Sequence, residues 1–215
     1  MAERLCFLVN SNNNVDEIYV SFDYVKGMAF SQRVKCANSL AGAINDRWPT
    51  LRHLEVSTKS NNIIGKQLSA FNLTMGDYSV ESIFQSSKVF EGNIQFQFLI
   101  DQKPQEAKKF VRDAHKGNLI KFRYKGIDYP IQPKSAFYDW IYINALNESE
   151  YADKVLDFDI FSDIEFNDKK SINCQARAVA IYVSITRKCK KEYYLSDFNH
   201  FIELYKDTVD GQLIR

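Results

Sequence analysis

The stretch that decides the fold reads YSVESIFQSSKVF and covers residues 78–90. Ser79 is a preferred residue for capping the start of a helix, and Gly92 is a preferred stop signal just past a helix end. The pattern therefore predicts a helix that runs from Ser79 to about Phe90.

Three polar residues of this helix, Glu81, Gln85 and Lys88, fall at positions i, i+4 and i+7. At 3.6 residues per turn they form one narrow stripe, which borders the apolar face expected to be buried. A carboxylate, an amide and an amine so placed are suited to line a pocket, where burial shifts the pKa values of both ionisable groups. The alternative is that Glu81 only interacts favourably with the helix dipole, and that the stripe is part of an ordinary polar surface.

The elements before this stretch are expected to form an N-terminal extension, residues 1–62, packed on a core domain of residues 63–215. Alternating apolar residues around a polar loop indicate the hairpin, and a capping serine followed by a periodic apolar face indicates the helix. The predicted elements are a hairpin of residues 5–9 and 17–25, a helix of residues 31–44 and a strand of residues 54–57.

The elements after this stretch are mixed, without the alternating rhythm of a parallel α/β sheet. They predict an α+β fold, one compact domain that is mainly helical with a small antiparallel sheet. Residues 175–185 suit either a strand or a helix, and this choice stays open. The other predicted elements are helices over residues 104–114, 135–146 and 197–206, and two strands within residues 119–131 around a turn at Lys125 and Gly126.

Composition narrows the class of protein. The 215 residues are 45% hydrophobic and 26% charged, as in an ordinary globular protein. A net charge of +1 gives no global basic field, so any contact with nucleic acid must come from a local patch. The four cysteines lack metal-ligand spacing, and no apolar run suits a signal peptide or a membrane span. We expect a cytoplasmic protein with no metal, no cofactor and no membrane contact.

Other segments suggest ligand contacts, each with a structural alternative. Small polar residues at 68–73 suit a turn that offers backbone N–H groups to a ligand, or an ordinary strand end. Trp140 suits stacking on a base or adenine, or a place in the core. Arg177 suits bidentate contact with a pyrophosphate, or a structural ion pair. The basic run of residues 186–191 suits a phosphate backbone, or a solvated face.

The order of these pieces resembles the NADAR family, named for its link to NAD and ADP-ribose chemistry. Leu68-Ser69-Ala70-Phe71-Asn72 is followed by Tyr-x-x-Glu-x-x-Phe-Gln-x-x-Lys at residues 78–88 and later by Asp139-Trp140. Ala70 stands where many members carry Asn, and Asp163 is the best stand-in for a late Asp-x-x-Trp-Gly segment that this chain lacks. Three further segments, residues 25–32, 54–60 and 161–164, resemble the subgroup paired with DarT-type toxins, which attach ADP-ribose to guanine in DNA.

The resemblance implies an antitoxin that hydrolyses the bond between ribose C1 of ADP-ribose and the exocyclic amine of guanine in single-stranded DNA. ADP-ribose would be the product, and a DarT-type toxin the functional partner. Two alternatives remain: an N-glycosidase that acts on a small ribosylamine metabolite, and an antitoxin that acts by binding the toxin.

The resemblance also implies roles for particular residues. We expect Glu81 to stabilise the oxocarbenium-like transition state or to deprotonate water. Lys88 is expected to attack C1 and form a transient Schiff base, with Lys59 as the competing amine. Trp140 and Asp163 complete the expected catalytic set. The expected ligand-binding residues are Lys59, Ser69, Phe71, Asn72, Gln85, Gln175 and Arg177.

Overall fold

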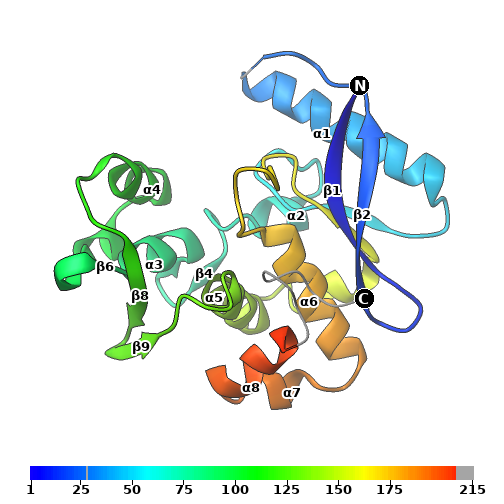
Figure 1. Cartoon of the computed structure of the whole chain (residues 1–215). Helices are drawn as coiled ribbons and strands as arrows, with labels where there is room; N and C mark the ends of the chain where they lie inside the picture. Colours follow the sequence, from blue (N-terminus) through cyan, green and yellow to red (C-terminus); the bar gives the residue numbers. More distant parts are fainter. Residues whose placement is uncertain (28, 207–215) are drawn as a thin grey trace.

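The computed structural model describes residues 1–27 and 29–206, and its first two strands form the expected hairpin (Figure 1). β1 (Ala2–Val9) pairs antiparallel with β2 (Val15–Phe22). The Asn10 side chain closes the loop between them, because its Oδ1 accepts hydrogen bonds from the backbone N–H groups of Asn12 and Asn14. Met28 of the segment 25–32, and residues 207–215 at the end of the expected core domain, lie outside the described residues.

This hairpin belongs to a four-stranded sheet with the order β2-β1-β10-β3. β10 (Ile160–Ser162) lies antiparallel to β1 and parallel to β3 (His53–Glu55). A strand from late in the chain therefore lies between two strands of the expected N-terminal extension, so residues 1–62 share one sheet with the core domain.

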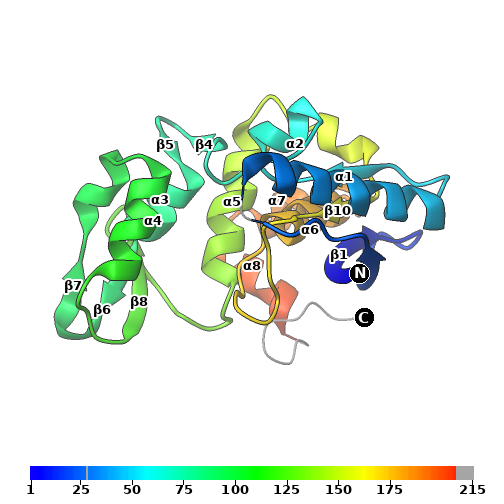
Figure 2. The same ribbon diagram turned by 90° about the horizontal axis from the view of Figure 1, so that it is seen from above.

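Helices cover both faces of this sheet (Figures 1 and 2). On one face lies α1 (Phe30–Arg47), whose buried residues Leu40 and Ile44 belong to a small core with Val20 and Phe22 of β2. On the other face lies α6 (Gln175–Arg187), which packs on β1, β10 and α5 (Ala136–Glu148). The sheet is thus the middle layer of this half of the molecule.

The segment that suited either a strand or a helix is the helix α6. Every residue from Ala176 to Ile185 is buried, so α6 is enclosed on all sides, as an all-round apolar helix requires. The alanines at its start let neighbouring elements approach closely, and tertiary packing outweighs the strand preference of its β-branched residues.

A second lobe, residues 80–131, holds the other four-stranded sheet, with the order β7-β6-β8-β9. The predicted pair of strands and its turn are present here, since Lys125 and Gly126 adopt positive φ angles of 50° and 77°. The elements of this lobe are α3 (Val80–Ser86), β6 (Lys88–Phe90), β7 (Ile94–Gln95), α4 (Pro104–Asp113), β8 (Leu119–Tyr124) and β9 (Ile127–Tyr129).

The predicted helix from Ser79 begins as expected but ends earlier. The Ser79 hydroxyl caps α3 by accepting a hydrogen bond from the backbone N–H of Ser82. The hydroxyls of Ser86 and Ser87 both donate to the carbonyl of Ile83, and the chain then leaves the helix and enters β6. The prediction that the helix continues to Phe90 is therefore wrong, because local serine-to-backbone bonds compete with the last helical turn.

The remaining elements are short. The predicted final helix is divided, because a 3-10 turn, Glu203–Tyr205, follows α8 (Phe198–Ile202). Within the described part of the chain, no helix combines the length and the apolar composition that a bilayer span requires. The other short elements are α2 (Ile63–Gln67), β4 (Thr74–Met75), β5 (Tyr78–Ser79) and α7 (Lys191–Tyr194).

Candidate functional site

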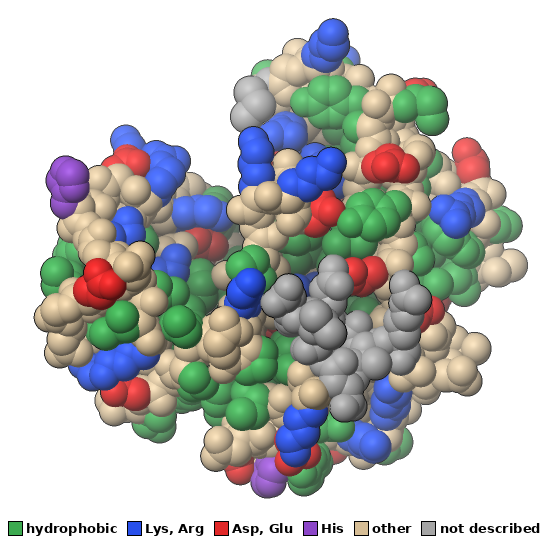
Figure 3. All heavy atoms as spheres, viewed as in Figure 1, with side chains coloured by type: hydrophobic (Ala, Val, Ile, Leu, Met, Phe, Trp, Pro, Cys, Tyr) green, Lys and Arg blue, Asp and Glu red, His purple; other side chains and the backbone are tan. Residues whose placement is uncertain are grey.

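A cavity of about 410 Å³ is lined by α3, α4 and the loops that follow β3 and β10. Figure 3 shows a hollow between the lobe that carries α4 and the lobe that carries α1, with Lys and Arg side chains on both sides of it. Its volume lies within the range typical of small-molecule sites. The cavity therefore lies between two parts of the fold, with one wall from each.

Glu81 provides the carboxylate of the first wall, on the first turn of α3. Its side chain is 5% exposed, and its Oε1 accepts a hydrogen bond of 2.8 Å from Nε2 of Gln85. The Nζ of Lys108, on α4, lies 3.7 Å from the same oxygen. Among residues 1–27 and 29–206, Oε2 of Glu81 has no hydrogen-bond partner. The second oxygen is therefore available to a substrate or a water molecule in the cavity.

Lys88 continues this polar line although it lies on β6 and not on the helix. Its Nζ donates a hydrogen bond of 2.8 Å to Oε1 of Gln85 and lies 4.5 Å from the ring centroid of Phe84. Burial lowers the pKa of Lys88 to about 8, and the Glu81 carboxylate opposes part of that change. The predicted stripe is thus one hydrogen-bonded chain, Lys88 to Gln85 to Glu81, along the wall.

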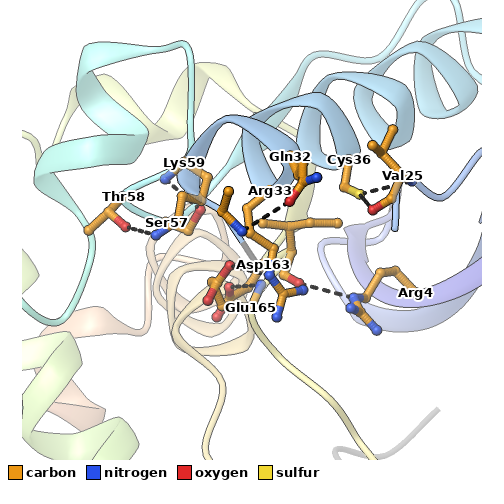
Figure 4. Close-up of polar contacts among 12 residues, drawn as sticks. Arg4, Val25, Gln32, Arg33, Cys36, Ser57, Thr58, Lys59, Asp163 and Glu165 are labelled. Atoms are coloured by element: carbon orange, nitrogen blue, oxygen red, sulfur yellow. Dashed lines mark hydrogen bonds and ion pairs between the residues drawn. The ribbon is translucent and has the colours of Figure 1, made fainter. Parts of the chain in front are cut away.

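Asp163 and Lys59 belong to the opposite wall. Figure 4 shows Asp163 and Glu165 side by side beneath α1, and Lys59 beside the N-terminal end of that helix. Oδ1 of Asp163 accepts a hydrogen bond from the backbone N–H of Glu165, and Nζ of Lys59 donates to Oγ1 of Thr58. Burial, and then the charge of the nearby Glu55, raises the pKa of Asp163 well above its usual range. The second wall therefore offers a protonated carboxyl group and an amine.

Glu55 holds this wall in place from behind, although it was not among the predicted site residues. Its carboxylate accepts hydrogen bonds from the Ser57 hydroxyl, the Ser162 hydroxyl and the backbone N–H of Ile164. Since Ser57 and Ile164 lie in the loops after β3 and β10, one buried side chain ties both loops together. Glu55 lies within the segment 54–60 that resembles the DarT-paired subgroup, and that resemblance is the sequence signal that could have identified it.

Gln175 connects the two walls at the start of α6. Its Oε1 accepts a hydrogen bond of 2.8 Å from the backbone N–H of Ala70, and its Nε2 donates one of 2.7 Å to the carbonyl of Val56. Gln175 lines the cavity, but both ends of its amide are engaged with backbone. The structure therefore places it as a positioning residue for the segments around Val56 and Ala70.

Comparison with known families identifies the family of this chain. A family model described as DarT1-associated NADAR antitoxin matches residues 2–212. The chain belongs to this NADAR family. No curated protein matches the chain. The family model confirms the resemblance seen in the sequence, and with it an antitoxin role associated with a DarT-type toxin.

Most predicted site residues of this NADAR antitoxin line one cavity. Glu81, Gln85 and Lys88 come from the first wall, and Ser69 and Phe71 from the turn before it. The second wall adds the predicted residues Lys59, Asp163 and Gln175. Residues that are more than a hundred positions apart in the chain are thus brought together.

Asn72, also predicted as a ligand contact, does not line this cavity. It is exposed, and its Nδ2 donates a hydrogen bond of 2.8 Å to the carbonyl of Lys66. The side chain therefore closes the turn after α2, which is the structural alternative for this segment.

Trp140 and Arg177 lie away from the cavity as well, which corrects their expected roles. The Trp140 ring packs against Phe198 and Phe201 of α8, with centroid distances of 5.9 and 5.3 Å. Nη2 of Arg177 lies 3.1 Å from Oδ2 of Asp139 in a buried ion pair. In the NADAR antitoxin, the structural alternatives for both residues hold: one is a core aromatic and the other a structural cation.

Tyr138 and Lys108 are among the cavity residues that the sequence analysis missed. Tyr138 lies two positions before Trp140 on α5, and residues two apart on a helix point to nearly opposite sides. The prediction therefore identified the correct helix, but Tyr138, and not Trp140, lies on the helix face that lines the cavity. Lys108 lies within the predicted helix of residues 104–114, and its approach to Glu81 depends on how α4 packs against α3.

A larger cavity of about 610 Å³ lies elsewhere, lined by Tyr78, Tyr124 and Arg123 among others. Its two carboxylates, Asp77 and Glu148, are exposed, and neither belongs to a chain of buried polar groups. The smaller cavity holds the buried carboxylates and the amine of lowered pKa, so the smaller cavity is the candidate functional site of this NADAR antitoxin.

Proposed function

We propose that this cavity hydrolyses the N-glycosidic bond between ADP-ribose and the exocyclic amine of guanine in DNA. The observation that carries the proposal is the buried Glu81 carboxylate, whose Oε1 is held by Gln85 while Oε2 is left available to the cavity. A fixed carboxylate beside an anomeric carbon is what glycosidic hydrolysis requires. The activity would explain how an antitoxin reverses the product of a DNA-modifying toxin.

The proposed reaction breaks one bond and forms one. As the bond from ribose C1 to the guanine nitrogen breaks, positive charge develops on C1 and the ring oxygen, and the Glu81 carboxylate stabilises that charge. A water oxygen bonds to C1, and one water proton is transferred to Glu81. The products are unmodified guanine in DNA and free ADP-ribose.

Asp163 is suited to protonate the departing amine. Because burial and the Glu55 charge raise the pKa of Asp163, its carboxyl group retains its proton at neutral pH. Two carboxyl groups kept in different protonation states by their surroundings are the usual arrangement for acid and base roles in one site. Asp163 would donate to the guanine nitrogen while Glu81 acts on the opposite side of the bond.

The charges of the walls suit ADP-ribose. Lys59 and Lys108 enter the cavity from different lobes, so two ammonium groups can flank the two negative charges of a pyrophosphate. The Phe71 ring lines the cavity with the Nζ of Lys108 at 5.4 Å from its centroid. An adenine ring stacked on Phe71 would place the pyrophosphate near these amines.

Lys88 offers a second route, in which its neutral amine attacks C1 of the ring-opened ribose, which is still joined to guanine as an imine. The two amine protons pass to the guanine nitrogen, which leaves as the free amine, and water then hydrolyses the resulting Schiff base to release ADP-ribose. We expect borohydride added during turnover to leave an ADP-ribose adduct on Lys88, identified by peptide mass. Its yield should rise with pH and reach half its maximum near pH 8, because the amine must lose its proton and its pKa is about 8.

The matched variants for this trapping experiment are Lys88→Gln and Lys59→Gln, which remove the two competing amines. The adduct should vanish in the first and persist in the second. An adduct on Lys59 alone would transfer the role to that residue. Turnover without any reducible adduct would leave the direct attack of water, assisted by Glu81, as the route.

The test of the function uses a single-stranded oligonucleotide that carries ADP-ribose on one guanine. Incubation with the protein should return unmodified DNA and free ADP-ribose, both measured by mass. Release from ADP-ribosylated guanosine but not from DNA would favour a small-metabolite enzyme. Release from neither substrate, together with a stable complex on mixing with the toxin, would favour an antitoxin that acts by binding.

A further inference from the structure

One side of the cavity mouth carries positive charge and exposed aromatic rings, in the described residues of the segments 24–45 and 56–76. These two segments hold five lysine and arginine residues and no aspartate or glutamate, in a chain whose net charge is only +1. We call them the basic lip. Figure 3 shows Lys and Arg side chains gathered beside the hollow on the lobe that carries α1.

The two segments of the basic lip are connected. Nδ2 of Asn61, just before α2, donates a hydrogen bond of 2.6 Å to Oδ1 of Asn38 on α1. Nζ of Lys59, which lines the cavity, lies 4.8 Å from the ring centroid of Phe30 at the start of α1. The surface of the lip therefore continues directly into the cavity.

Four lysines of the lip are available to an anionic partner. Within residues 1–27 and 29–206, none of Lys26, Lys35, Lys59 and Lys66 makes an ion pair. Arg33 is different, because its Nε lies 3.6 Å from Oε1 of Glu165. A group of lysines without acidic partners attracts phosphate groups, and the entropy of released counterions favours that contact.

Aromatic rings lie among these lysines. Phe30 is 60% exposed and Tyr24 is 40% exposed, although both are large and apolar enough to be buried in most folds. Exposed rings interspersed with cations are the pattern that binds single-stranded nucleic acid, since bases stack on the rings while phosphates meet the cations. Phe30 contacts Lys59, and Lys59 lines the candidate site, so the pattern begins at the edge of the cavity.

From these observations we propose that the basic lip binds the single strand of DNA next to the modified guanine, with one neighbouring base stacked on Phe30. The lip would make the site selective for a polymer over a free nucleotide. The inference rests on the proposed function, since it assigns the part of the substrate that lies outside the cavity.

The binding experiment is independent of catalysis. It measures fluorescence anisotropy of an unmodified single-stranded oligonucleotide with the full chain and its variants. Phe30→Ser should weaken binding about tenfold, given the usual loss when a stacking ring is removed. Ile127→Ser is the matched control, because Ile127 is 58% exposed on β9, at the far end of the other lobe, and should change nothing (Figure 1).

A second pair of variants tests the charges. The Lys26→Gln, Lys35→Gln double variant should lower the slope of log affinity against log salt by about 1.4, at roughly 0.7 for each phosphate contact to a single strand. The Lys190→Gln, Lys191→Gln variant removes the same charge from the basic run of residues 186–191 and should leave the slope unchanged. An unchanged slope in the Lys26→Gln, Lys35→Gln variant, together with a lower slope in the Lys190→Gln, Lys191→Gln variant, would place the DNA strand on residues 186–191 and overturn the proposal.

The kinetic experiment separates this proposal from the function itself. With Phe30→Ser, KM for the modified oligonucleotide should rise about tenfold while kcat, and all constants for ADP-ribosylated guanosine, stay unchanged. An equal loss on both substrates would show that Phe30 acts through Lys59 in the cavity, which overturns the lip. Normal DNA binding by Phe30→Ser, combined with loss of a complex with the toxin, would also overturn the proposal that the lip binds DNA. If wild type hydrolyses neither substrate, the function fails and the binding experiment alone decides the lip.

Discussion

A Glu81→Gln variant is expected to fold normally and to release unmodified DNA about a thousandfold more slowly than wild type. The amide has nearly the shape of the carboxylate, and its oxygen can still accept the hydrogen bond from Nε2 of Gln85. It cannot carry the negative charge that opposes the developing cation, nor accept a proton from water. Loss of such a group removes factors of roughly 10² to 10⁴.

The measurement is single-turnover release from the guanine-modified oligonucleotide, followed by mass. Glu106→Gln is the control, because Glu106 is an exposed carboxylate on α4 and should not alter the rate. Near-normal release by Glu81→Gln would remove Glu81 from the chemistry and leave Asp163 and Glu165 as the other carboxyl groups that line the cavity. Unchanged thermal unfolding would show that the loss is chemical and not structural.

An Arg177→Met variant is expected to lose about 3 to 5 kcal/mol of unfolding free energy. Arg177 is 5% exposed and Asp139 is fully buried, and Oδ2 of Asp139 accepts hydrogen bonds from Nη2 of Arg177 and from the Tyr205 hydroxyl. Without the guanidinium, the carboxylate is a buried charge that lacks its cation. Removing one partner of a buried ion pair costs far more than the pair itself contributes.

The unfolding free energy lost in Arg177→Met should depend on pH in a defined direction. Burial raises the pKa of Asp139, and Arg177 opposes that rise. In the variant, the folded-state pKa therefore lies further above the unfolded value, and between the two values the folded chain binds more protons than the unfolded chain. The contribution of Asp139 to stability must then fall as pH rises from the unfolded pKa of about 4 to the folded-state pKa, over a wider pH range than in wild type.

Urea unfolding across this pH range checks the prediction. Arg112→Met, which breaks the exposed contact with Asp113, is the control and should change little. Below its unfolding temperature, Arg177→Met should have the same KM for the modified oligonucleotide as wild type, because Arg177 does not line the cavity. A stable variant with a raised KM would contradict the structural role and restore the pyrophosphate contact that the sequence suggested.

The sequence predicted local features of the fold well. The Ser79 cap, the turn at Lys125 and Gly126 and the proline-led start of α4 are set by residues within a few positions of one another. The stripe from Glu81 to Gln85 follows from helical spacing alone. Where the helix ends was less predictable, because the competing bonds of Ser86 and Ser87 to Ile83 carry no periodic signal.

The site was predictable in part for the same reason. Spacing identified the first wall, but the second wall depends on partners far apart in the chain, such as Gln175 with Ala70 and Glu55 with Ile164. The errors at Trp140 and Arg177 also have a common cause. Aromatic and guanidinium groups serve equally well in a core and in a ligand site, and only packing distinguishes the two.

The strand order β1-β10-β3 has a consequence for the order in which the chain is made. Translation delivers β1 and β3 early, but the strand between them is β10, residues 160–162, and the loop with Asp163 follows it. Gln175, which braces both walls, comes later still. A nascent chain that ends before residue 175 would therefore lack the hydrogen bonds that connect the segments around Val56 and Ala70, so the two walls of the candidate site are tied together only when most of the polypeptide has been made.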